Sequence, residues 1–321
     1  YSAAGGTLGT LAGAATALLF IMYLFGTTRK RYMNKINPGE RLESSASIYQ
    51  GLFLTIIPVI LSQTIYQIGY TIDDLMFGNL MALKGYKDQV VTSLQGVYNT
   101  QYNQLVNLPV AIATAMAAST LPSIVLSRMQ NDAHGVNQKI TQVIKVNMVI
   151  AFPSAIGLAV LAEPIMKMLF PRLVTYQPQA IMLLMTGSSA VVFYALSTLT
   201  TSILQGHNFM RLPVIHSAIS LGVHIVLLGI LLVATDLNVY ALVICNVLFP
   251  LVVSMLNCRA ITKEVGYRWE YWNTFIKPLL ASAAMGIVAF VVYRVFYEAF
   301  ENVYIVSLMA FGAAITVYAV V

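Results

Sequence analysis

One apolar stretch of the sequence carries polar side chains at a regular spacing that suits the binding of a sugar. Gln63, Gln67, Tyr70 and Asp74 follow one another at intervals of four, three and four residues, so on a helix they share one face. Amide and tyrosine side chains can hydrogen-bond to sugar hydroxyls and amides, and aromatic rings offer flat faces to sugar rings. Because polar groups facing lipid are costly, this stripe predicts a water-filled cavity or a polar contact with another helix.

The next apolar stretch opens with a run of amides and tyrosines, at 95–107, that is unusually polar for a membrane segment. Within it, Asn99, Asn103 and Asn107 are four residues apart. We expect these asparagines to line the same path as Gln67. The alternative is that the membrane segment begins only near Gln104 and that the run before it is an exterior loop.

The adjacent carboxylates Asp73 and Asp74 have three interpretations. They could mark the outer end of their helix, or they could bind the ion, Na⁺ or H⁺, whose gradient drives transport. A third interpretation is a Mg²⁺ site for pyrophosphate, as a membrane glycosyltransferase would require. The third is disfavoured because the pair is expected toward the exterior, away from cytoplasmic sugar nucleotides, and has no accompanying acidic cluster.

Three further ionisable residues are candidates for a contact with phosphate or between helices. His224 lies in the middle of an apolar stretch, two turns after His216, and we interpret it as a neutral imidazole bonded to a neighbouring helix, with a functional role as the alternative. Arg172 is expected at the exterior interface and Arg211 in a cytoplasmic turn. The sequence shows no metal-spaced His/Cys cluster, nucleophile elbow or phosphate-binding glycine loop, so we expect a protein that is not an enzyme and needs no cofactor.

The elements that position these residues are membrane helices. The sequence is 58% hydrophobic and 9% charged, with a mean hydropathy of +0.76, which excludes an ordinary soluble domain. Nine apolar segments have the roughly 20 residues that a helix needs to cross a bilayer, so the fold class is all-α, a polytopic membrane helix bundle. The segments are 3–25, 52–77, 95–126, 140–161, 179–204, 213–234, 239–261, 275–297 and 303–321.

Basic residues fall mainly in alternate gaps between these segments, which predicts the orientation of the chain. The gaps after the first, third, fifth and seventh segments, with their flanking turns, hold thirteen of the 18 Lys and Arg residues. Because cytoplasmic loops of membrane proteins are enriched in Lys and Arg, we expect Tyr1 outside and Val321 at the cytoplasmic side. The net charge of +6 is explained by these loops and by contact with lipid headgroups, not by nucleic-acid binding.

The chain divides into four expected parts. Residues 1–26 form the last helix of one bundle, 27–50 a cytoplasmic linker, 51–261 a six-helix bundle and 262–321 two additional helices. Both ends fall on apolar segments, so we expect a piece of a longer protein. Prolines inside several segments predict kinked helices that bend during a transport cycle, or static packing geometry; they are Pro58, Pro109, Pro122, Pro153 and Pro250.

Three stretches of sequence resemble a known family. They are IDDLMFG at 72–78, GVYNTQYNQLVNLPVAIATAMAASTLP at 96–122 and SILQGHNFMRLPV at 202–214. Together they are similar to the sporulation stage V protein B group of polysaccharide-biosynthesis exporters. That group belongs to the multidrug/oligosaccharidyl-lipid/polysaccharide flippase superfamily and is close to the bacterial lipid II flippases.

The resemblance implies a transporter of about fourteen helices in two bundles, of which this chain would hold the sixth to the fourteenth. It implies alternating access in a bacterial cell membrane, with a monomer moving a lipid-linked oligosaccharide or peptidoglycan precursor under an ion gradient or membrane potential. The family's arginines on early helices precede this chain, and His224 stands where many relatives have lysine. A drug or metabolite antiporter of the same superfamily is the main alternative function, and a membrane glycosyltransferase is the other.

Overall fold

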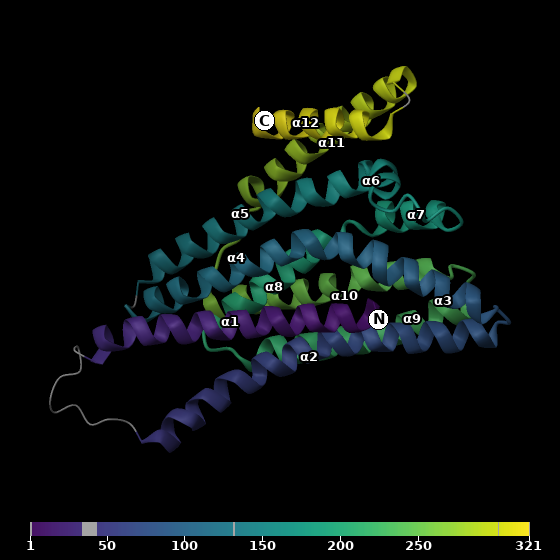
Figure 1. The fold of residues 1–321 in the computed structure, drawn as a ribbon. Helices are drawn as coiled ribbons and strands as arrows, with labels where there is room; N and C mark the ends of the chain where they lie inside the picture. The colour runs from purple at the N-terminus through teal and green to yellow at the C-terminus, as the bar shows by residue number, and fades with distance from the viewer. Residues whose placement is uncertain (1, 34–43, 131, 301, 321) are drawn as a thin grey trace. The chain divides into compact units, whose positions relative to one another are not determined.

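The computed structural model describes residues 2–33, 44–130, 132–300 and 302–320, and the regular elements in these ranges are all helices (Figure 1). Three of them, η1 to η3, are π-helical turns that continue or introduce α-helices. The bounds are α1 Ser2–Met33, α2 Ser45–Leu83, α3 Asp88–Gly96, η1 Val97–Tyr102, α4 Asn103–Met129, α5 Ala133–Val160, α6 Ala162–Leu169, α7 Gln177–Gly187, α8 Ala190–Gly206, α9 Arg211–Ala234, α10 Val239–Ala260, η2 Ile261–Val265, η3 Trp272–Ile276, α11 Lys277–Phe300 and α12 Val303–Val320.

The chain forms two compact units, residues 1–54 and 55–321. The first contains α1 and the opening turns of α2. Helix α1 continues to Met33 and α2 begins at Ser45, so the expected linker at 27–50 is helical at both of its ends. Residues 34–43, in its middle, lie outside the described part of the chain.

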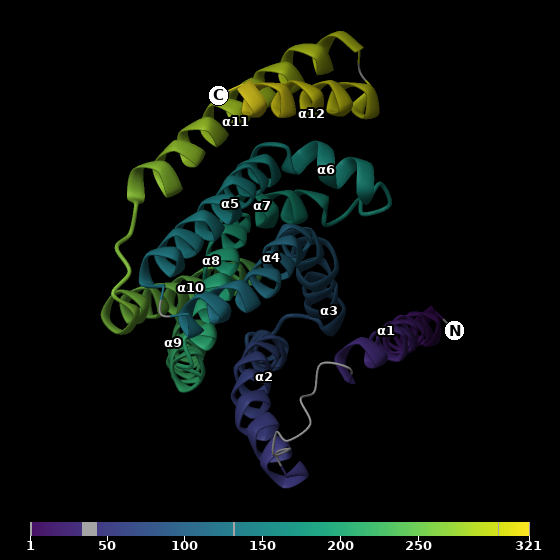
Figure 2. The same cartoon turned by 90° about the vertical axis from the view of Figure 1, so that its left-hand side faces the viewer.

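The second unit is a helix bundle with α8 near its centre. Helix α8 packs against α4, α5 and α10, and α9 packs against α10 (Figure 2). Helices α11 and α12 form a hairpin whose first helix lies along α5. The core is apolar but includes two fully buried tyrosines of η1, Tyr98 and Tyr102, which matter for the site described below.

The described residues confirm the membrane-helix prediction. Eight helices are long and apolar enough to cross a membrane, and a ninth span arises if α7 and α8, bent by 46° at a short break, count as one. Each of the nine expected segments coincides with one of these spans. The polar run at 95–107 lies within a continuous helical span, Asp88–Met129, so the alternative of an exterior loop there is wrong.

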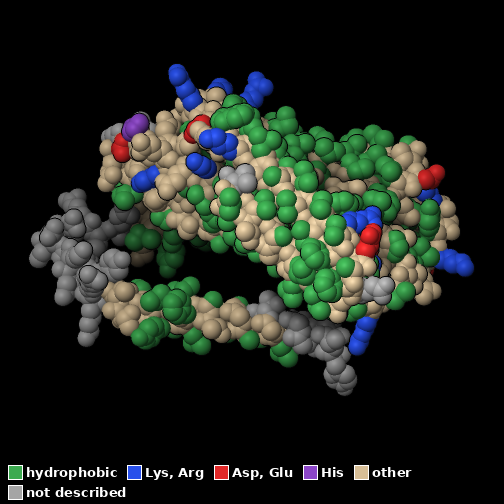
Figure 3. Space-filling model, turned by 90° about the horizontal axis from the view of Figure 1, so that it is seen from above, with side chains coloured by type: hydrophobic (Ala, Val, Ile, Leu, Met, Phe, Trp, Pro, Cys, Tyr) green, Lys and Arg blue, Asp and Glu red, His purple; other side chains and the backbone are tan. Residues whose placement is uncertain are grey.

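Within the second unit, the gaps of the two sets lie at opposite ends. At one end, Lys84 Nζ is 2.6 Å from the Thr235 carbonyl oxygen, and Lys167 Nζ lies 5.5 Å from the centre of the Tyr297 ring. At the other end, Lys145 and Arg268 line one hollow in the surface. Figure 3 shows charged side chains toward both ends and apolar side chains between them. This separation agrees with the charge pattern, and the direction of the chain across the membrane stays a prediction.

Candidate functional site

A cavity of about 290 Å³ brings together four of the six residues predicted to line a substrate path. Gln63, Gln67 and Tyr70 come from α2, where the spacing of four and three residues puts them on one face, and Asn107 comes from α4. The rest of the lining consists of Tyr66, Val110, Thr114, Tyr194, Thr198 and Thr201. The wall is therefore made of amides, hydroxyls and aromatic rings, and none of these lining side chains is charged.

Asn99 and Asn103 do not line this cavity. Asn103 Nδ2 donates to Asn99 Oδ1 at 3.3 Å, and Asn99 Nδ2 donates to Asp74 Oδ1 at 2.9 Å. The π-helical turn η1 changes the register between Asn99 and Asn107, because a π-turn adds a residue to the helical repeat and rotates what precedes it. Asn99 consequently binds Asp74 of α2, and Asn103 binds Asn99; sequence spacing alone could not show this.

Asp73 is buried in the bundle, with 2% of its surface exposed. Its Oδ1 lies 2.6 Å from His224 Nε2, and its Oδ2 accepts a hydrogen bond from the Tyr98 hydroxyl at 3.4 Å. Helix α2 continues past Asp73 to Leu83, a further ten residues or about 15 Å of helix. The interpretation that the acidic pair marks the end of its helix is therefore wrong.

His224 joins three helices. Its ring is 5% exposed, its Nε2 meets Asp73 of α2, and its Nδ1 lies 3.3 Å from the Cys245 carbonyl oxygen of α10. The ring also meets the edge of Phe249 at a centroid distance of 5.9 Å. The imidazole is bonded to neighbouring helices, as expected, and one partner is a carboxylate; its neutral state stays a prediction.

A chain of hydroxyls and one amide connects this buried pair with the cavity wall. The Tyr102 hydroxyl is 3.0 Å from Asn246 Oδ1, Asn246 Nδ2 donates to the Tyr194 hydroxyl at 3.1 Å, and the Tyr70 hydroxyl donates to Tyr194 at 3.4 Å. Tyr98, which binds Asp73, stacks on Tyr102. Sequence reasoning missed Asn246 and Tyr194. The available signal was Asn246, one of two asparagines in the apolar helix α10.

The remaining candidates lie apart from this site. Arg172 follows α6 and lines a separate hollow of about 480 Å³ with Gln101. Arg211 is the first residue of α9, thirteen residues before His224. The structure therefore does not bring either arginine together with the acidic pair or the cavity.

The acidic pair does not form a metal site with other residues. The described part of the chain has no group of three His, Cys, Asp or Glu side chains able to hold a metal ion. Asp73 and Asp74 bind different partners, His224 and Asn99, so their carboxylates do not converge. This geometry does not fit the Mg²⁺ site of the glycosyltransferase interpretation.

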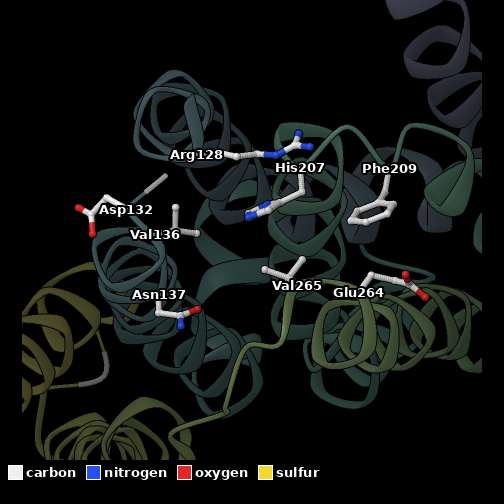
Figure 4. A pocket seen from close by; sticks show the side chains of 8 residues that line it. All are labelled: Arg128, Asp132, Val136, Asn137, His207, Phe209, Glu264 and Val265. Atoms are coloured by element: carbon white, nitrogen blue, oxygen red, sulfur yellow. The ribbon is translucent and has the colours of Figure 1, made fainter. Parts of the chain in front are cut away.

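A second cavity, of about 320 Å³, opens where α4 ends and α5 begins (Figure 4). Arg128 runs beside the ring of His207, whose Nδ1 is 2.9 Å from the Ile203 carbonyl oxygen. Burial, and then the charge of Arg128, lower the pKa of His207 from its usual value. Asp132 points away from the centre and caps α5 by accepting from the Gly135 amide at 2.9 Å. The polar groups here do not converge, so the first cavity remains the candidate site.

Comparison with known proteins identifies the family. The model of the family described as lipid II flippase MurJ matches residues 2–312. The chain belongs to this family. It is 22% identical over 324 residues to the lipid II flippase MurJ of Bacillus subtilis (strain 168), which covers 97% of this chain and 59% of that protein. It is also 25% identical over 218 residues to the uncharacterized membrane protein YabM of the same organism, covering 67% of this chain and 38% of that protein.

Membership of the MurJ family confirms the resemblance to lipid II flippases that the three motifs carry. Together with eight or nine membrane-length helices in the described ranges, it makes this a multi-pass protein of the bacterial inner membrane. The chain spans about three-fifths of the length of the MurJ relative.

Proposed function

We propose that the protein carrying this chain is a flippase that moves a lipid-linked peptidoglycan precursor, of the lipid II type, across the membrane by alternating access. The observation that supports this most directly is the uncharged polar cavity inside a bundle of membrane-length helices. Gln63, Gln67 and Asn107 would hydrogen-bond to the sugar and peptide groups of the substrate. Its lipid tail would stay in the bilayer, because burying a long apolar chain in a polar cavity is unfavourable.

The composition of the same cavity supports the flippase over the drug antiporter. A site for cationic drugs is expected to offer a carboxylate that pairs with the buried cation, whereas the lining here consists of three amides, three threonines, three tyrosines and one valine, without a charge. A substrate pyrophosphate would need positive charge from elsewhere, and the family resemblance implies arginines on helices that precede this chain. The flippase is therefore favoured over the antiporter.

The proposal includes a source of energy and an orientation. Asp73 and Asp74 would couple transport to an ion gradient, as the only two acidic residues on α2. The end of the second unit that holds Lys145 and Arg268 would face the cytoplasm, which places Tyr1 outside and Val321 inside. Residues 1–26 would close the preceding bundle, residues 262–321 would be additional helices, and one copy would suffice for transport.

The test is transport of a fluorescent lipid-linked precursor by the full-length protein in proteoliposomes. Gln67→Ala and Asn107→Ala should each reduce the initial rate several-fold, because each removes a hydrogen-bonding group from the cavity. Asn79→Ala is the matched control: it changes an amide on the same helix, whose Nδ2 donates to its own helix at Leu75, and should leave the rate unchanged. Equal rates for all three variants would contradict the cavity assignment, and no transport by the wild type would contradict the function.

A further inference from the structure

The Asp73–His224 pair lies well inside both of the helices that carry it. His224 is thirteen residues from the start and ten from the end of α9, and Asp73 is ten residues from the end of α2. At 1.5 Å per residue the pair is about 15 Å from the C-terminal ends of both helices, which meet where Lys84 contacts Thr235; this depth is half of a hydrocarbon core roughly 30 Å thick. A charge at that depth is costly unless it is paired.

The hydrogen-bond partners of His224 fix the number of protons in the pair. A carbonyl oxygen only accepts, so the contact from Nδ1 to the Cys245 oxygen, at 3.3 Å, requires a proton on Nδ1. The 2.6 Å contact from Nε2 to Asp73 Oδ1 requires a second proton between those two atoms. Whether the second proton sits on nitrogen or on oxygen, the pair as a whole carries no net charge.

Removing one proton breaks this arrangement. The remaining proton can sit on Nδ1 or on Nε2, and the other ring nitrogen then turns a lone pair toward an oxygen, either Asp73 Oδ1 or the Cys245 carbonyl. The pair also acquires a net charge of −1 in the middle of the bundle. Both consequences favour separation of the two side chains and entry of water. The observed geometry therefore belongs to the proton-bound state.

We propose that Asp73 and His224 together bind the proton that couples to transport, and that its binding and release close and open the contact between α2 and α9. This deepens the proposed flippase function and rests on it. The step is a simple proton exchange: one H⁺ enters the gap between Nε2 and Oδ1 from water, and the same H⁺ leaves to water.

Helix α2 is held against the bundle by side-chain contacts more than by close backbone packing, so loss of the Asp73–His224 contact can change its position. In the described chain its backbone does not approach another helix as closely as α8 approaches α4 and α10. Side chains bridge the gap instead: Asp73 to His224, Gln95 Nε2 to the Asp74 carbonyl oxygen at 2.8 Å, and Tyr70 to Tyr194. Since Gln63, Gln67 and Tyr70 lie on the same helix, a displacement of α2 would reshape the cavity wall.

The groups that face the pair support proton binding over binding of a metal cation. From η1 the Tyr98 hydroxyl covers Asp73 Oδ2, from α10 come Cys245 and the ring of Phe249, and on α2 itself Asp74 is the neighbouring charge. Among the described side chains, His224 is the basic group paired with Asp73. A metal cation would have to displace both the imidazole and the hydroxyl from the two carboxylate oxygens.

The first test observes the proton directly and needs no substrate. Full-length protein with ¹⁵N-labelled histidine is titrated with pH, and the His224 signals are assigned by their loss in His224→Gln. We expect one transition that leaves Nδ1 protonated and changes Nε2, and Asp73→Asn should abolish or displace it. His216→Gln is the control on the same helix, since His216 Nδ1 is 2.7 Å from Asn257 Oδ1 and has no carboxylate partner; the His224 transition should persist in it. A His224 signal that does not change with pH would overturn the proposal.

The second test separates this proposal from the flippase function. Proteoliposomes clamped at zero membrane potential receive either a pH gradient without Na⁺ or a Na⁺ gradient at equal pH. A pH gradient should raise the rate of precursor transport several-fold in the wild type and in His216→Gln, and should have no effect in His224→Gln. Tyr98→Phe, which keeps the ring and removes one hydrogen bond to Asp73, should retain stimulation at a shifted pH. Transport that is stimulated by Na⁺ and unaffected by the pH gradient would overturn the proton proposal and leave the flippase function standing. A His224 signal that titrates, with no precursor transport in any gradient, would overturn the flippase function and leave proton binding standing.

Discussion

The contact of α2 with α9 and the contact of α5 with α11 are built in opposite ways. At the second, the backbones approach so closely that a Cβ on Gly286 would lie 2.6 Å from Ile156 Cγ2. At the first, a Cβ on Gly69 would lie 3.8 Å from Leu221 Cδ1, an ordinary contact, and the buried Asp73–His224 pair spans the interface. Small residues at α5–α11 permit the close van der Waals packing that holds helices together in lipid.

This difference indicates which interface can change during transport. The packing energy of two close helices decreases gradually as the helices separate, because it is the sum of many weak, short-ranged dispersion contacts. A buried proton-sharing pair has two discrete states with different net charge, and so can switch. We therefore expect α5 and α11 to move as one body and α2 to move relative to α9.

The largest effect is expected from Asp73→Ala, which removes the side chain that bridges α2 and α9. The substitution leaves His224 buried without its partner, and breaking one side of a buried ion pair costs about 3–5 kcal/mol. The thermal unfolding midpoint of the full-length protein in detergent should fall clearly. Asp74→Ala is the control, because Asp74 is only half-buried and binds the exposed Asn99, and its midpoint should fall much less. Similar losses in both variants would contradict a special role for the Asp73 bridge.

The opposite interface is tested by adding a single methyl group. Gly286→Ala should destabilise the protein by about 1–3 kcal/mol, the usual cost of overpacking, because Ile156 is β-branched and stiff at χ1. Gly69→Ala on α2 should be neutral or slightly stabilising, since alanine is the better helix former by roughly 1 kcal/mol and the space exists. Unfolding midpoints measure both. A loss at Gly69 as large as at Gly286 would show that α2 is packed as tightly as α11.

Part of the candidate site could be predicted from the sequence. The stripe Gln63, Gln67 and Tyr70 was predictable because helical periodicity is local, and Asn107 joined it as expected. The Asp73–His224 contact joins residues 151 positions apart, and no spacing rule reaches across separate helices. The π-turn η1, which directs Asn99 to Asp74, likewise has no signature in residue type, because it depends on how Tyr98 and Tyr102 are accommodated in the bundle.

A smaller effect is expected where the hydroxyl chain meets the cavity. Tyr194→Phe keeps the ring and removes the hydroxyl that accepts from Asn246 at 3.1 Å, so a buried amide loses a partner at a cost of about 1–2 kcal/mol. If this series of hydrogen bonds couples the protonation of the Asp73–His224 pair to the cavity, the pH dependence of transport should shift as well. The transport rate measured from pH 5 to pH 9 checks this. Thr198→Val, in the same cavity wall, is the control and should leave the pH profile in place.

The smallest effect is expected at the C-terminal end of α2, where the contact with the end of α9 is exposed to water. Lys84 Nζ is 3.5 Å from Asp236 Oδ1, but the Asp236 side chain is 99% exposed, and exposed ion pairs contribute little because water and salt screen them. Asp236→Ala should therefore leave both the unfolding midpoint and the transport rate within experimental error, at low and at high salt. A clear fall in the unfolding midpoint at low salt that disappears at high salt would show that the Lys84–Asp236 ion pair holds the end of α2. The buried Asp73–His224 pair would then not be the main contact between α2 and α9.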